Sequence, residues 1–122
     1  MVENQREIES IAKALNKSWS IESSSKWTIE NPAKGHCGVT SLVVNDLLGG
    51  KIVKTKLPDG WHFYNLIDGN RYDFTSSQFK KPILYMDIPS DRKEAYLDTN
   101  EKQYASLRQR VITNLHTLKS NE

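Results

Sequence analysis

The chain has 122 residues and a mass of 14.0 kDa, enough for one domain around one hydrophobic core. Its 3 Trp, 5 Tyr and 3 Phe argue against disorder, although the mean hydropathy is −0.64. A net charge of +2 is too small to indicate nucleic-acid binding, and the longest apolar run, Ile83–Met86, is too short for a transmembrane helix or a secretion signal. We therefore expect a single domain over residues 1–122, with no nucleic-acid or membrane partner.

Two helices are predicted in the first half of the chain. Between Glu3 and Asn16, apolar residues recur every three or four positions, which is typical of an amphipathic helix. Residues 18–34 are rich in Ser and predict a loop, which we expect to pack back onto the domain through its tryptophans. The apolar spacing in Cys37–Leu48 predicts a buried helix that ends at Gly49.

The second half predicts a small antiparallel sheet followed by a helix. Strand character is found in 51–56, in 61–67 and in 70–75, while residues 80–88 predict a weaker strand or an extended segment. Asp68-Gly69 lies between two of these runs and is typical of a two-residue hairpin turn, while Pro58-Asp59-Gly60 predicts the preceding turn. Residues 99–119 predict an amphipathic C-terminal helix. The order of elements indicates the α+β class.

The hairpin carries the most specific inference about a site. With a two-residue turn, one face holds side chains expected to lie against a core: Trp61, Phe63, Asn65, Ile67, Tyr72 and Phe74. The other, polar face holds His62 and Asp73 as diagonal cross-strand neighbours, about 7–8 Å apart at the backbone and within reach of a hydrogen bond. A three-residue loop would move Asp73 to the opposite face, so this pairing depends on the register.

The single cysteine, Cys37, excludes an intramolecular disulfide and a cysteine-ligated zinc site. It indicates a reducing compartment, and we expect a cytoplasmic protein. Cys37 begins a predicted helix, where free N–H groups and the helix dipole lower the pKa of a thiol. A carboxylate on an imidazole fixes its tautomer, so Cys37, His62 and Asp73 form a candidate nucleophile, base and orienting acid. Asn65 is an alternative third member.

The motifs GHCGVTSLVVNDLLGG, HFYN, YDFT and QF occur in this order between Asn31 and Phe79. This stretch of 49 of the 122 residues resembles the YunG-like family of small, largely uncharacterised bacterial proteins. The order of cysteine, histidine and aspartate is also similar to that of transglutaminase-like and papain-like thiol enzymes. That resemblance implies a cysteine-bearing helix packed on a small antiparallel sheet, with Cys37, His62 and Asp73 as the triad. His36 stands where the family often has glutamine.

These observations lead to three functional hypotheses. The first is a thiol hydrolase or acyltransferase for a small-molecule or peptide acyl substrate, in which His36, Trp27, Tyr64 and Asn65 help to line the substrate site. The second is a non-catalytic binding or interaction module on the same fold, and the third is a redox-responsive thiol protein. We expect no cofactor and no metal, since the sequence has neither HExxH nor paired Cys/His spacing. The sequence carries no signal for an oligomeric state.

Overall fold

The secondary structure follows the predicted order of elements. The structure, a computed structural model, describes residues 2–120. Its helices are α1 (Val2–Ser18), α2 (Cys37–Leu48), α3 (Arg92–Tyr96) and α4 (Glu101–Ser120), and its strands are β1 (Lys51–Leu57), β2 (Gly60–Ile67), β3 (Asn70–Tyr72) and β4 (Ile88–Pro89), with a 3-10 turn, η1 (Ser76–Gln78). The α+β class is confirmed. Within residues 2–120, no helix combines the length and apolar character needed to cross a bilayer.

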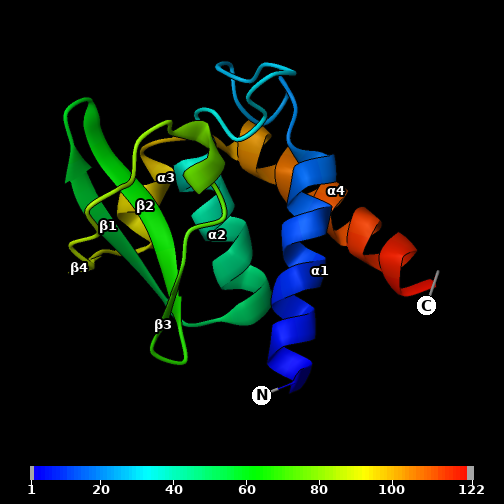
Figure 1. Cartoon of the computed structure of the whole chain (residues 1–122). Coiled ribbons are helices and arrows are strands. Elements are labelled where there is room, and N and C mark those ends of the chain that lie inside the picture. Colours follow the sequence, from blue (N-terminus) through cyan, green and yellow to red (C-terminus); the bar gives the residue numbers. More distant parts are fainter. Residues whose placement is uncertain (1, 121–122) are drawn as a thin grey trace.

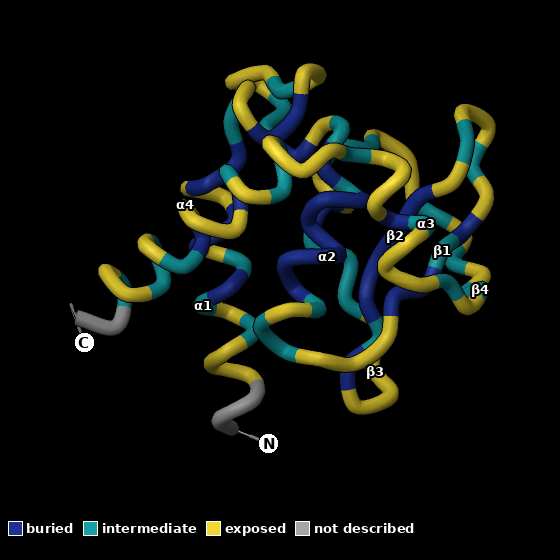
Figure 2. The backbone as a smooth tube through the Cα atoms, turned by 180° about the vertical axis from the view of Figure 1, so that it is seen from behind, coloured by how far each residue is buried: buried dark blue, intermediate teal, exposed yellow. Residues whose placement is uncertain are grey.

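Helix α2 lies at the centre of the molecule, between the sheet on one side and the pair α1 and α4 on the other (Figure 1). All of residues 38–44 are buried, as the dark tube of α2 in Figure 2 shows. Val39 and Val43 pack against α1 and α4, while Leu42 packs against the sheet. Burying each such side chain contributes about 1.5–3 kcal/mol, so the all-round apolar character of α2 places it between two layers.

The sheet is antiparallel, in the order β3-β2-β1-β4. Ile67 pairs with Asn70 across a two-residue turn, and both turn residues have positive φ, 52° at Asp68 and 80° at Gly69. Positive φ at both positions is the geometry that the Asp-Gly dipeptide favours. The predicted hairpin register is therefore confirmed, but β3 ends at Tyr72, so Asp73 lies just beyond the paired strand.

Strand β2 is buried on both faces, which corrects the expectation of one core face and one polar face. Phe63 and Asn65 lie toward α2, while Tyr64 is covered by the segment after β3, where its hydroxyl accepts a hydrogen bond from Asp87 N–H. Trp61, predicted to face the core, is 44% exposed. It lies near the start of the strand. Instead of packing against a helix, its ring contacts the ammonium groups of Lys54 and Lys56.

The segment at 80–88 takes the extended form of its two predicted alternatives, whereas α3 is an element that was not predicted. Residues 80–88 form an extended strap across the sheet, of which only Ile88 belongs to a strand, β4. Helix α3 was not predicted because it is only one turn long and has a single buried apolar residue, Ala95. Its signal is local: Asp91 caps the helix by accepting the N–H of Glu94 at 2.8 Å. The loop at 19–36 does pack back, since Trp19 is buried and its indole N–H donates to Thr40 Oγ1.

Candidate functional site

A cleft of about 810 Å³ lies where the amino end of α2 meets the start of β2 and residues 78–83, which run from the end of η1 into the strap. Its chemically active lining residues are Cys37, His62, Gln78 and Asp98, and its charged rim includes Lys26, Lys34, Lys80 and Lys81. The volume is in the range of small-molecule sites, about 300–1,000 Å³. The cleft therefore collects two of the three predicted catalytic residues, and Asp73 binds one of them.

His62 is held by Asp73, as the hairpin register predicts. The two side chains are 2% and 5% exposed, and His62 Nε2 lies 2.7 Å from Asp73 Oδ2. A carboxylate only accepts hydrogen bonds, so this contact places the imidazole hydrogen on Nε2. In the neutral ring, Nδ1 is then the nitrogen that carries the free lone pair, and it is buried without a hydrogen-bond partner. The ring is also fixed by an edge contact with Phe79.

Asp73 has two roles, one in a local turn and one in holding His62. Its Oδ1 accepts the backbone N–H and the hydroxyl of Thr75, which forms a turn typical of an aspartate after a strand. Its Oδ2 accepts from His62 and from the Tyr85 hydroxyl at 2.8 Å. The local turn thus orients the carboxylate toward His62, and the strap at 80–88 supplies the second donor.

Cys37 begins α2, as predicted, but its environment differs from the expected one. Its Sγ donates to Asp98 Oδ2 at 3.4 Å, and Asp98 Oδ2 also accepts the N–H of Gly38 at 3.2 Å. Burial, followed by the Asp98 charge, raises the pKa of the Cys37 thiol to about 12, against a weaker opposing effect of the Phe63 backbone. The expectation that the helix start lowers this pKa is therefore wrong, because desolvation and a nearby carboxylate outweigh the helix dipole.

Gly38 allows Asp98 to approach Cys37. A Cβ at Gly38 would lie 2.7 Å from Asp98 Cβ and 2.8 Å from the carbonyl oxygen of Ala95. The residue at the α2 cap position, His36, makes no side-chain capping bond. Asp98 therefore caps α2 from the turn between α3 and α4, and the absence of a side chain at Gly38 makes room for it.

The structure does not join all three predicted catalytic residues. His62 and Asp73 form a hydrogen-bonded pair, and Cys37 and His62 line the same cleft. The Cys37 thiol, however, is bonded to Asp98, and His62 Nδ1 has no partner among residues 2–120. In this state, Cys37 and the His62–Asp73 pair are two separate halves of a site.

The four side chains expected to help line the substrate site do not line the cleft. His36 is fully buried, with Nε2 2.7 Å from Ser23 Oγ, and burial lowers its pKa to about 4. Trp27 packs on the core. Tyr64 binds Asp87 through its hydroxyl, and Asn65 donates to the Ser41 carbonyl of α2. Hydrogen bonds and packing contacts therefore hold these four side chains inside the folded domain and outside the cleft lining.

Gln78 was not predicted as a site residue, yet it lines the cleft and has a buried donor without a partner. Its Oε1 accepts the Gly35 N–H at 3.3 Å, and its backbone carbonyl accepts from Asn31 Nδ2. Its Nε2 is buried and has no partner. A buried donor without an acceptor costs about 1–3 kcal/mol, which a ligand oxygen recovers. The QF motif contains this glutamine and was the only sequence signal for it.

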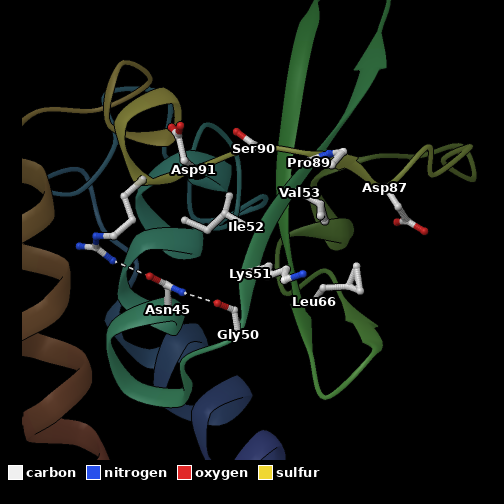
Figure 3. Close-up of a pocket in the computed structure, with 11 residues that line it drawn as sticks. Asn45, Gly50, Lys51, Ile52, Val53, Leu66, Asp87, Pro89, Ser90 and Asp91 are labelled. Atoms are coloured by element: carbon white, nitrogen blue, oxygen red, sulfur yellow. Dashed lines mark hydrogen bonds between the residues drawn. The ribbon is translucent and has the colours of Figure 1, made fainter.

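A second pocket, of about 460 Å³, lies between α2, β1 and β4 (Figure 3). Three of its charged groups already have partners: Arg92 donates to Asn45, Asp87 binds Arg71, and Asp91 caps α3. It contains none of the buried unpaired side-chain atoms found in residues 2–120. Those residues also contain no group of three His, Cys, Asp or Glu side chains that could hold a metal ion. The cleft at Cys37 is therefore the better candidate site.

The fold and the site define an α+β protein with a cleft lined by one cysteine and one carboxylate-bound histidine. The family model described as YunG protein matches residues 7–116. The chain is 52% identical over 111 residues to the uncharacterized protein YunG of Bacillus subtilis (strain 168), covering 91% of this chain and 96% of that protein. The chain therefore belongs to the YunG family.

No solved structure matches the chain. The comparisons thus confirm the family resemblance, and they give no support to the wider similarity to papain-like and transglutaminase-like enzymes. The cysteine-bearing helix packed on a small antiparallel sheet is observed, but its relation to those folds stays a prediction.

Proposed function

We propose that the cleft is an acyl-transfer site in which Cys37 is the nucleophile and His62 is the base. The observation that carries this proposal is the His62–Asp73 pair, which leaves a basic, unpartnered Nδ1 on the residue that shares the cleft with Cys37. A base held by a carboxylate and a thiol in the same cleft are two of the parts that nucleophilic catalysis requires. Gln78 Nε2 supplies a donor for the carbonyl oxygen of the acyl group.

In the proposed reaction, the Cys37 thiol leaves Asp98 and gives its proton to His62 Nδ1. The sulfur attacks the carbonyl carbon, the carbon–sulfur bond forms, and the bond to the amine or thiol leaving group breaks. The leaving group takes the proton from His62. Water or an amine then attacks the thioester, so that the acid or the new amide departs and the thiol is restored.

Acylation of Cys37 by p-nitrophenyl acetate at pH 7 tests this proposal, because the chain has a single cysteine to report the thioester by mass spectrometry. We expect His62→Gln to slow acylation by about 10²–10⁴-fold, as loss of a general base does. We expect Asp73→Asn to slow it as well, whereas His116→Gln on α4 is the matched control and leaves the rate unchanged. Equal rates in wild type and His62→Gln would overturn the proposal.

A second candidate function is non-catalytic ligand binding in the same cleft. It is favoured by one observation: the Cys37 thiol donates to Asp98, and its pKa is raised to about 12. A thiol in that state is a weak nucleophile at neutral pH. If Cys37 titrates near this value and is not acylated, while ligands still protect the cleft lysines from acetylation, the binding function is the better description.

A further inference from the structure

The positive charge of the chain is concentrated at the cleft. The lining contains four lysines, Lys26, Lys34, Lys80 and Lys81, against two carboxylates, Asp59 and Asp98, for a net charge of +2. The whole chain has 17 basic and 15 acidic residues, also +2. Removing the lining residues leaves 13 basic and 13 acidic residues, so the rest of the chain is balanced.

These lysines are not used by the fold. They come from two segments, the loop before α2 and the strap after η1, and their side chains are exposed. None of the four takes part in a salt bridge among residues 2–120, in contrast to Lys54, which binds Glu94 at 2.8 Å. One of the two opposing carboxylates, that of Asp98, is already bound to the amino end of α2. The rim therefore presents uncompensated cations.

Within the function proposed above, on which this step rests, we infer that the acyl substrate is a small compound that carries an anionic group, held by the lysine rim while its carbonyl lies between Cys37 and Gln78. The volume of about 810 Å³ suits such a compound. Several cations around one concave site raise the local concentration of an anion and its rate of arrival. The ligand chemistry is thus an acyl carbonyl plus a carboxylate or a phosphate.

Two alkylating reagents of nearly equal size test this inference. Iodoacetate is an anion and iodoacetamide is neutral, and both react with the same Cys37 thiolate. The rate with iodoacetate divided by the rate with iodoacetamide is therefore independent of the pKa of the thiol. This ratio reports only the charge of the cleft. We expect Lys80→Gln/Lys81→Gln to lower this ratio by about threefold to tenfold, and 0.5 M NaCl to lower it in wild type.

The matched control is Lys13→Gln/Lys17→Gln on α1, which makes the same change in net charge outside the cleft and leaves the ratio unchanged. A ratio that is the same in wild type, in the rim variant and in the control overturns the inference but leaves the acyl-transfer proposal intact. The acyl-transfer proposal is tested separately, by the acylation rate of His62→Gln.

A second readout needs no reactive thiol. Trp61 lines the cleft and is 44% exposed, so its fluorescence is open to collisional quenchers. We expect iodide to quench the Trp61 fluorescence more strongly in wild type than in Lys80→Gln/Lys81→Gln. Neutral acrylamide is expected to quench both proteins equally. In Trp61→Phe, the part of the iodide quenching that depends on these lysines is expected to be absent. Equal iodide quenching in the two proteins overturns the inference even if Cys37 reacts with neither reagent.

Discussion

The Cys37 thiol donates to Asp98 Oδ2 at 3.4 Å, and the same oxygen accepts the N–H of Gly38. One carboxylate therefore caps α2 and holds the thiol hydrogen away from His62. Burial raises the pKa of Cys37, the negative charge of Asp98 disfavours the thiolate further, and the pKa reaches about 12. Burial and Asp98 together favour the protonated thiol, and the reaction proposed for Cys37 requires the loss of this contact.

Asp98→Asn is expected to lower the pKa of Cys37. The amide oxygen of asparagine still accepts the Gly38 N–H, so the cap is kept while the charge is removed. A fall of one pKa unit raises the thiolate fraction tenfold at a pH well below the pKa, and we expect alkylation by iodoacetamide at pH 8 to be at least about tenfold faster. The measurement is the alkylation rate from pH 6 to pH 11.

Asp59→Asn is the matched control for this change, because Asp59 also lines the cleft but makes no hydrogen bond to Cys37. It removes the same charge and is expected to shift the profile little. Profiles of Asp98→Asn and wild type that coincide would mean that burial alone sets the pKa of Cys37. Thermal denaturation of both variants verifies that the fold is unchanged.

Gln78 is expected to matter for reactions at a carbonyl and not for other reactions of the thiol. Acylation by p-nitrophenyl acetate develops negative charge on oxygen, whereas disulfide exchange with 4,4′-dithiodipyridine does not. Removing one such donor typically costs about 10²–10³ in rate. We therefore expect Gln78→Glu, which keeps an acceptor for the Gly35 N–H but loses the amide donor, to slow acylation more than exchange.

The carboxylate of Gln78→Glu also repels the thiolate, so Gln78→Met serves as a neutral second variant. The acylation rate divided by the exchange rate removes any effect on the thiol itself. A ratio that stays at the wild-type value in both variants contradicts the role of Gln78, even if acylation still depends on His62. If the ratio falls in Gln78→Glu but not in Gln78→Met, the new negative charge, and not the loss of the amide donor, slows acylation.

The parts of this site that were predictable from sequence are local. The Asp68-Gly69 turn fixes the register, and the register brings Asp73 near His62 even though Asp73 lies beyond the paired strand. The contact of Cys37 with Asp98 joins residues 61 positions apart. It depends on how α3 and its following turn pack on Gly38, and no periodicity in the sequence specifies that packing.

His36 is a second residue whose place in the fold depends on contacts that the sequence does not specify. Its place directly before Cys37, where the family often has glutamine, led to the expectation that its side chain helps to line the substrate site, although adjacent side chains of a helix diverge. The ring lies between Trp19 and Ser23, in the loop that packs back onto α2. The loop at 19–36 covers this face of the helix start, so the ring is not among the residues that line the cleft.

The burial of His36 makes stability depend on pH. Burial lowers its pKa from 6.5 to about 4, so the unfolded chain takes up a proton at this residue between these values while the folded chain does not. The stabilising contribution is complete above pH 6.5 and is lost as the pH falls toward 4, by about 3 kcal/mol in all. We expect His36→Gln, which cannot titrate, to flatten the fall in the free energy of unfolding measured by urea denaturation from pH 7 to pH 4. The assignment is wrong if the slopes of His36→Gln and wild type are equal, because another group then binds the proton.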